Sequence, residues 1–107
     1  MKKGVVVFFG VLFLAQLSFA AEKIKNCEFK GISLQGKVKF VRNFGDIKVK
    51  VVDNFEDFKV KVRENFANSC GEWKIVENFP DFTVEIVDAF ADIDVKFVEY
   101  FPGVSGE

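Results

Sequence analysis

The chain has 107 residues, its 15 basic and 16 acidic side chains nearly balance, and histidine is absent. Without histidine it lacks the commonest general base and the commonest metal ligand, so we expect no enzyme, no cofactor and no metal. A net charge of −1 argues against nucleic acid or an anionic membrane as partner, because both attract strongly basic surfaces.

The first 20 residues have the pattern of a secretory signal peptide. Lys2 and Lys3 form a positive amino end, and residues 5–17 are an apolar run too short to span a bilayer comfortably. Ser18 and Ala20 are the small residues that a signal peptidase requires. We predict cleavage after Ala20 and a periplasmic or secreted product with 13 basic and 16 acidic groups, a net charge of −3. An uncleaved anchor is the alternative.

Residues 21–36 form a lead-in segment that carries Cys27, one of two cysteines in the chain; the other is Cys70. An even number of cysteines in an exported protein indicates a disulfide, which here would close a loop of about 44 residues. Two buried free thiols are the alternative. A redox role is not indicated, because redox cysteines usually lie two residues apart.

Six copies of an 11-residue unit fill residues 37–104. They read KVKFVRNFGDI, KVKVVDNFEDF, KVKVRENFANS, EWKIVENFPDF, TVEIVDAFADI and DVKFVEYFPGV. Only Cys70 and Gly71 interrupt the series, so residues 37–69 and 72–104 form two halves of three units within a domain of residues 37–107. Position 8 of the unit is phenylalanine in all six copies, and positions 2 and 4 are always apolar.

A period of 11 fits a helix, since 11 residues complete three turns, but it also fits one strand and one turn per unit. The apolar positions are mostly valine, isoleucine and phenylalanine, which favour strands, and Pro80 and Pro102 would interrupt a helix. Asparagine, aspartate, glycine and proline gather at positions 7, 9 and 10, where a turn would fall. We predict an all-β fold of strands of about seven residues joined by bends, with the position-8 phenylalanines turned inward as most of the core.

Charge divides unevenly between the halves. Residues 37–71 carry eight basic and five acidic groups, whereas residues 72–104 carry two basic and eight acidic ones. One interpretation is that the halves pair through complementary faces. The other is that these are solvated strand faces on which lysines prevent pairing at a sheet edge. Exposed ion pairs contribute little, so charge alone favours the first interpretation only slightly.

Three strand-and-bend units on each side of an insertion with Gly-x-Trp resemble the septoil-knot domain, a family of small bacterial proteins with a seven-crossing torus knot. The resemblance rests on CGEWKIVENFPDF and on the flanking copies KVKVVDNFEDF and DVKFVEYFPGV, and it covers residues 37–104. It implies a knotted all-β monomer, and it brings no enzymatic activity and no site residues. An unknotted β-solenoid or meander of the same units is the alternative.

Four position-10 residues form an aspartate ladder: Asp46, Asp57, Asp81 and Asp92. They could line a cation groove, but the favoured interpretation is that each caps its bend by bonding nearby backbone amides. A hydrolase with a carboxylate pair is a weaker alternative, because nothing selects one pair among 16 acids.

Three residues are weak interaction candidates: Arg63, Trp73 and Tyr100. Trp73 stands at a core position and should be buried, whereas Tyr100 stands at a turn position and should be exposed. Arg63 and Ser69 replace apolar residues just before the insertion, so the best recognition site the sequence offers lies there.

The expected function is that of a non-enzymatic, highly stable structural or protein-interaction module of the cell envelope. Its protein partner is unknown, and we expect no nucleic acid and no membrane insertion after cleavage. Interlocked strands resist unfolding and proteolysis, which suits that compartment. A small-ligand or cation-binding protein that uses the aspartate ladder or the Arg63–Trp73 region is the alternative.

Overall fold

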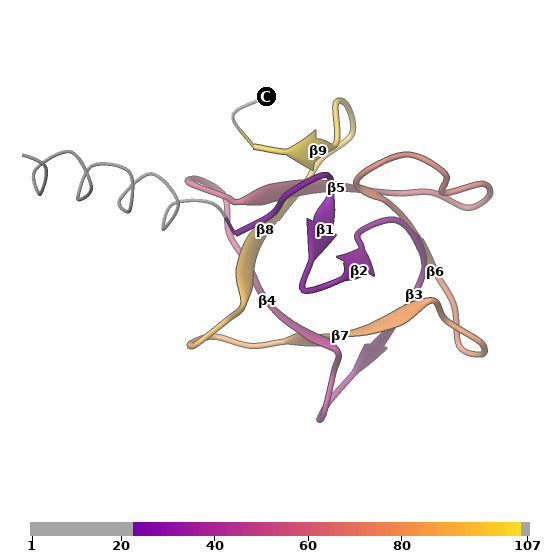
Figure 1. Ribbon diagram of the computed structural model, residues 1–107, viewed down its shortest axis with the longest axis horizontal. Helices are drawn as coiled ribbons and strands as arrows, with labels where there is room; N and C mark the ends of the chain where they lie inside the picture. Colours follow the sequence, from indigo (N-terminus) through magenta and orange to yellow (C-terminus); the bar gives the residue numbers. More distant parts are fainter. Residues whose placement is uncertain (1–22, 106–107) are drawn as a thin grey trace, which may run out of the picture.

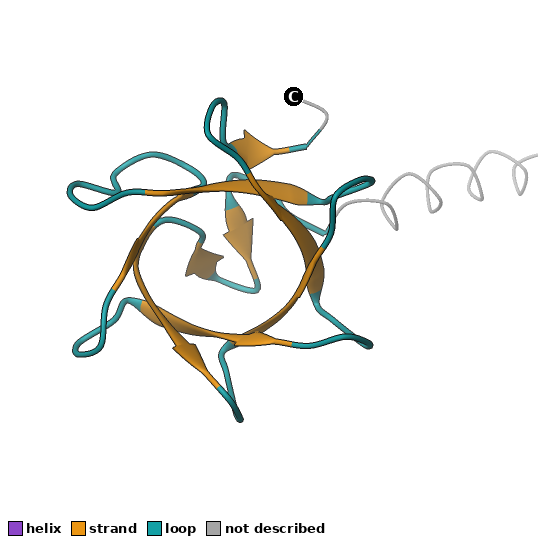
Figure 2. Ribbon diagram, turned by 180° about the vertical axis from the view of Figure 1, so that it is seen from behind, coloured by secondary structure: helices purple, strands orange, loops and turns teal. Residues whose placement is uncertain are grey.

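The computed structural model describes residues 23–105. The predicted signal peptide of residues 1–20, with its cleavage site after Ala20, lies outside the described residues. Residues 23–105 contain β-strands and no helix (Figure 1, Figure 2). The strands are β1 (Glu28–Phe29), β2 (Ile32–Ser33), β3 (Gly36–Val41), β4 (Ile47–Val51), β5 (Phe58–Val62), β6 (Glu72–Ile75), β7 (Phe82–Ile86), β8 (Ile93–Phe97) and β9 (Gly103–Val104). The all-β class predicted from the repeat is confirmed.

Six parallel strands, one from each repeat unit, close into a barrel. Within the described chain their order is β6-β3-β7-β4-β8-β5, and β5 pairs with β6 to complete the ring. Strands of the first half alternate with strands of the second, so each half winds once round the barrel (Figure 1). The pairing of the halves is therefore confirmed. A solenoid or meander is excluded, because strands consecutive in sequence are not neighbours, and a closed ring leaves no barrel edge for lysines to protect.

Complementary charge between the halves is only partly realised. Acidic residues lie opposite lysines at three places: Glu85 opposite Lys48, Asp94 opposite Lys50 and Glu72 opposite Lys61. Lysines lie opposite each other at two places: Lys37 opposite Lys74 and Lys59 opposite Lys96. Like charges opposite each other destabilise a sheet, so these two lysine pairs are not explained by strand pairing.

The core consists of the side chains that point into the barrel from positions 11 and 2. The buried residues at these positions are Val38, Ile47, Val49, Phe58, Val60, Trp73, Phe82, Val84, Ile93 and Val95. The register advances by two residues from strand to strand, so Val38 lies beside Phe82 and Ile47 beside Val84. Equivalent positions of the six units therefore lie at one level along the barrel. The barrel strands have four to six residues, fewer than the seven predicted, because the chain turns outward soon after position 4.

The two ends of the barrel differ. At the carboxyl end, the position-4 side chains are 38–50 % exposed: Phe40, Val51, Val62, Ile75, Ile86 and Phe97. At the amino end, the hairpin of β1 and β2 covers the core and lies within the ring of strands in both ribbon views (Figure 1, Figure 2). Phe29 and Leu34 from this segment are buried in the core. The lead-in segment thus closes one end of the barrel.

The predicted disulfide between Cys27 and Cys70 is present and fastens the hairpin to the start of β6. Beside it, the Leu34 carbonyl accepts hydrogen bonds from the Gly71 backbone N–H (3.1 Å) and from Nε1–H of Trp73 (3.2 Å). A Cβ atom at Gly71 would lie 2.6 Å from the Lys59 carbonyl oxygen, and Gly71 has φ of +85°. The insertion between the halves therefore requires glycine at this position.

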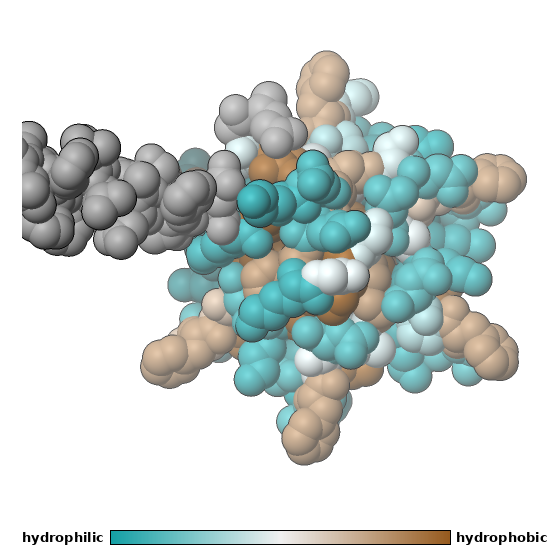
Figure 3. All heavy atoms as spheres, in the orientation of Figure 1, coloured by the Kyte–Doolittle hydropathy of each residue, from teal (hydrophilic) through white to brown (hydrophobic). Residues whose placement is uncertain are grey.

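The position-8 phenylalanines lie at the outer tips of the bends, so the prediction that they turn inward is wrong. These tip phenylalanines are 77–96 % exposed: Phe44, Phe55, Phe66, Phe79, Phe90 and Phe101. Figure 3 shows apolar side chains at the points of a star-shaped outline, separated by hydrophilic surface. The alternation that buries positions 11 and 2 ends with the strand, and those two layers already fill the barrel. Position 8 lies beyond the sheet, where no core is available to it.

Candidate functional site

The tip phenylalanines adopt a backbone conformation that suits other residues better. Their φ angles lie between +51° and +61°, in the left-handed region that costs an L-residue with a Cβ about 1–2 kcal/mol. Glycine and asparagine occupy this region most readily. Burial does not compensate for the strain, because the side chains are exposed. The fold alone would therefore favour a different residue at every tip.

The other bend positions have diverged among the units, whereas position 8 has not. Position 9 is occupied by Gly45, Glu56, Ala67, Pro80, Ala91 and Pro102. Position 7 is asparagine in four units and is replaced by Ala89 and Tyr100 in the last two. Common descent of the units would leave positions 7 and 9 as uniform as position 8. Retention of an exposed, strained phenylalanine at all six tips therefore indicates a role outside the fold.

Charge is segregated between the bends and the barrel wall. Exposed acidic residues stand two places before the tip phenylalanine in five units: Asp53, Glu64, Glu77, Asp88 and Glu99. Lysines stand at outward positions 1 and 3 of the strands: Lys37, Lys39, Lys48, Lys50, Lys59, Lys61, Lys74 and Lys96. Five tips thus combine an aromatic ring with nearby negative charge, whereas Arg42 stands at that place in the first unit. The wall between the tips is mainly positive, because its eight lysines outnumber the three acids Glu72, Glu85 and Asp94 at the same positions.

The aspartate ladder connects neighbouring strands. Each carboxylate accepts a hydrogen bond from a backbone N–H at position 1 of another unit: Asp46 from Thr83 (2.9 Å), Asp57 from Asp94 (2.9 Å), Asp81 from Lys37 (2.8 Å) and Asp92 from Lys48 (2.8 Å). Hydrogen bonding to backbone amides was predicted correctly, but the predicted partners close in sequence are wrong. The donors lie 37 or 44 residues away, because the strand beside each bend comes from the other half.

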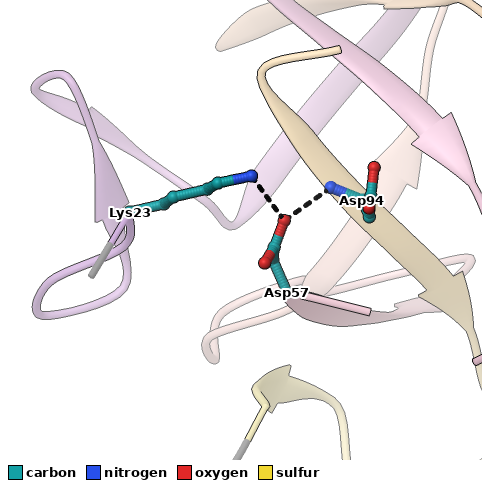
Figure 4. Close-up of polar contacts among 3 residues, drawn as sticks. All are labelled: Lys23, Asp57 and Asp94. Carbon is teal, nitrogen blue, oxygen red and sulfur yellow. Dashed lines mark hydrogen bonds and ion pairs between the residues drawn. The ribbon is translucent and has the colours of Figure 1, made fainter. Parts of the chain in front are cut away.

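Asp57 has a second partner. Its Oδ2 accepts the bond from the Asp94 N–H and also lies 3.3 Å from Nζ of Lys23, as Figure 4 shows. This oxygen therefore ties the lead-in segment and β8 to the bend before β5. Among residues 23–105, no group of three or more histidine, cysteine, aspartate or glutamate side chains could hold a metal ion. The geometry of the ladder fits a structural role.

Two of the three candidates lie together, because the backbone N–H of Arg63 donates to the carbonyl of Trp73 (2.8 Å). The Trp73 side chain is buried between Phe82 and Phe97, with ring centroids 5.7 and 6.3 Å away. Arg63 is exposed and pairs with Glu72 at 3.6 Å. Tyr100 is exposed beside its neighbouring tip phenylalanine, as its turn position predicts. Trp73 therefore cannot stack on a ligand at the surface.

Sequence reasoning missed the tip phenylalanines because it treated a repeated aromatic residue as a core residue. The residues next to them in sequence could have identified them as turn residues. Four of them follow asparagine directly, and the residues around them are acids, glycine, alanine and proline. A phenylalanine inside a turn sequence lies outside the strand alternation, so its hydrophobicity is no evidence of burial.

Comparison with known families agrees with this architecture. The family model of the 7(1) septoil knot domain matches residues 31–105. The chain belongs to the septoil-knot family. The match includes all six units and the end of the lead-in segment, and the family name implies the seven-crossing knot. Two halves that wind alternately round one septoil-knot barrel agree with that description.

No curated protein matches the chain. In the part of the septoil-knot chain that the structure describes, no helix is long and apolar enough to cross a membrane. A functional assignment therefore has to come from the surface of the domain itself, and the tip phenylalanines are its most distinctive feature.

Replacing one tip phenylalanine with asparagine is expected to stabilise the septoil-knot domain. Phe55→Asn should raise the free energy of unfolding by about 1 kcal/mol, because asparagine accepts the left-handed backbone and no buried contact is lost. Chemical denaturation of the two proteins measures the difference. Phe97→Asn is the matched control, since Phe97 has no positive φ and packs against Trp73. The control should lose stability; a loss in both variants would contradict the interpretation of strain.

Proposed function

We propose that the domain is a non-enzymatic protein-interaction module of the cell envelope that binds through its tip phenylalanines. The observation that carries the proposal is the presence of the same exposed, strained aromatic residue at all six bend tips. Aromatic side chains, phenylalanine included, are enriched at protein interfaces relative to the rest of the surface. A residue that lowers stability and is nevertheless kept in every unit is typical of a binding surface.

The scaffold supports this function because it holds the tips in place. The bends are joined to strands of the other half through backbone hydrogen bonds such as Asp81 N–H to the Lys37 carbonyl (2.7 Å). Four of the six bends are also joined through the aspartate ladder. The disulfide fixes the plug, which is the hairpin of β1 and β2 that closes the amino end of the barrel. A rigid presentation lowers the entropy lost on binding. An interlocked barrel also resists unfolding, which benefits a protein outside the cytoplasm.

The location in the envelope rests on two features. The first 20 residues have the pattern of a cleaved signal peptide, and the disulfide is typical of oxidising compartments. Cell fractionation with an antibody against the domain tests this part. Recovery in the periplasm or the medium, with an amino terminus at Ala21, is the expected result; recovery in the cytoplasm with Met1 retained would contradict it.

Ligand or cation binding is less well supported. The aspartates of the ladder already accept backbone hydrogen bonds, and Trp73 of the Arg63–Trp73 region is buried. Calorimetric titration with calcium and a panel of sugars provides the test. We expect no heat of binding, and saturable heat would favour this second function over the first.

Crosslinking in living cells tests the interaction directly. p-Benzoylphenylalanine replaces Phe44 in one variant and Phe90 in another, and the cells that normally express the protein are illuminated. We expect the same crosslinked protein from both tips, identified by mass spectrometry. Control variants carry the crosslinker at Glu28 or Lys30, which are exposed on the amino-terminal hairpin. Equal crosslinking from tips and controls, or none from the tips, would contradict the proposal.

A further inference from the structure

We propose that a partner of each tip is a second copy of this chain, which receives it on the lysine-bearing wall between two of its own tips. The proposal rests on the proposed function, because it names the partner of the same tip phenylalanines. One molecule carries two surfaces that could bind each other. The tips present phenylalanine rings beside acidic residues, and the wall has hollows beside lysines.

The directions of the tips favour several partner molecules. Equivalent positions lie at one level along the barrel, so the tips point outward in different directions round its circumference (Figure 3). A flat membrane or one globular partner can contact only neighbouring tips on one side of such a star. Several molecules placed round the circumference can engage them all. Copies of the chain satisfy this condition when the tips of one molecule enter the spaces between the tips of the next.

Two hollows beside wall lysines could receive a tip. One has a volume of about 270 Å³, and Lys37, Lys74, Phe66 and Asp81 are among its lining residues. The other has a volume of about 360 Å³ and is lined by residues including Lys59, Phe101 and Pro102. A cavity of about 150 Å³ is enough to hold benzene. Each hollow therefore has room for the ring of a tip phenylalanine from another molecule.

The charges of hollows and tips are of opposite sign. Lys37 lies opposite Lys74, and Lys59 lies opposite Lys96, so each hollow adjoins a pair of like charges. In the first hollow the carboxylate of Asp81 offsets one of the two lysines. A tip brings an acidic residue two places before its phenylalanine in five of the six units. When the ring enters a hollow, that carboxylate comes close to the lysine pair. The receiving molecule thereby gains the opposite charges that its own strands do not supply.

This contact joins two different surfaces, a tip and a hollow, and it is therefore heterologous. Such contacts build open chains or layers unless a rotation closes them. One phenylalanine ring in a shallow hollow gives weak binding, so assembly should need several contacts and rise steeply with concentration. The family resemblance implies a monomer. Self-docking departs from that expectation, and measurement of the oligomeric state decides between the two.

Sedimentation velocity of the chain from residue 21 onward tests the proposal over a range of protein concentrations. A tip variant carries Phe→Asn at all six tips, and a wall variant carries Lys37→Glu, Lys74→Glu, Lys59→Glu and Lys96→Glu. Controls are Lys25→Glu with Lys30→Glu on the hairpin, and Ile86→Asn at the carboxyl end of the barrel. Circular dichroism and melting confirm that each protein is folded, and a variant with only Phe44, Phe55 and Phe90 replaced serves if the complete tip variant does not fold.

The expected results are specific. The unmodified chain and both controls should associate, and the tip and wall variants should each need at least about tenfold higher concentration to do so. A mixture of the two variants should associate again, because the wall variant supplies tips and the tip variant supplies hollows. Raising the sodium chloride concentration should weaken assembly.

A monomeric unmodified chain at millimolar concentration would overturn self-docking, as would a tip variant that assembles normally or a mixture that stays monomeric. Binding of the monomer to phosphatidylcholine vesicles through its tips would assign the tips to a lipid surface and overturn it too. If the chain stays monomeric while its tips crosslink a different protein in cells, only self-docking is wrong. If the tips neither assemble nor crosslink, the proposed function is wrong as well.

Discussion

Trp73→Ala is expected to lower the free energy of unfolding by about 3–5 kcal/mol, the range for deletion of a buried large aromatic side chain. Trp73 has no exposed surface, and its ring packs edge-on against Phe82 and Phe97. Its Nε1–H donates to the carbonyl of Leu34 in the lead-in segment. The substitution therefore leaves a cavity between two core layers and also removes a bond to the plug at the amino end.

Equilibrium urea denaturation followed by far-ultraviolet circular dichroism measures this effect. Long incubation is needed, because the knot that the family name implies would slow the approach to equilibrium. Tyr100→Ala is the matched control, since Tyr100 is an aromatic residue that is 72 % exposed. The control should change stability by less than about 0.5 kcal/mol. Similar losses in both variants would mean that Trp73 is not a central core residue.

The sequence predicts the strand part of each unit well because the physics there is local. Side chains alternate across a strand, so the apolar residues at positions 11 and 2 can be assigned to one face without knowledge of the strand order. Burial of Val49, Phe58 and Val95 follows from that alternation alone. The disulfide was predictable for a different reason, because the chain offers only one possible cysteine pair.

The bends were predicted poorly because their geometry depends on the other half of the chain. A bend that carries Phe90 ends at Asp92, and the carboxylate of Asp92 bonds to the N–H of Lys48, which is 44 residues away. Nothing near Asp92 in sequence identifies that donor. The phenylalanine then points outward because the bend leaves the sheet, and hydrophobicity gives no sign of this direction. Sequence reasoning placed the residue inside, where an isolated phenylalanine would be most stable.

The two pairs of lysines that lie opposite each other lower the stability of the sheet, so they indicate a role other than folding. Lys48 and Lys50 face acidic residues in the barrel, as a stable sheet requires. Lys37 and Lys59 face lysines instead, beside the two hollows. Both the lysine pairs and the strained tips lower the stability of the isolated domain. Features that oppose the fold are expected at functional surfaces, and here two such features complement each other in charge.

Removal of the disulfide is the second large effect that we expect. Cys27 and Cys70 are 43 residues apart, and on the chain-entropy model a loop of that length stabilises the folded state by about 4 kcal/mol. Cys27→Ala together with Cys70→Ala should therefore lower the free energy of unfolding by up to about this amount. The loop contains the whole first half of the repeat domain, so the bond limits the conformations of that half in the unfolded chain.

A local effect should accompany the loss of stability, because the disulfide also holds the plug over Trp73. The single tryptophan of the chain makes this visible by fluorescence. In the double variant, emission should shift to longer wavelength before the barrel unfolds, since release of the hairpin admits water to the Leu34 carbonyl and the indole beside it. Reduction of the unmodified chain should reproduce both effects. Unchanged stability and unchanged emission would mean that the hairpin is held by Phe29 and Leu34 alone, and that packing of the plug, not the covalent bond, closes the barrel.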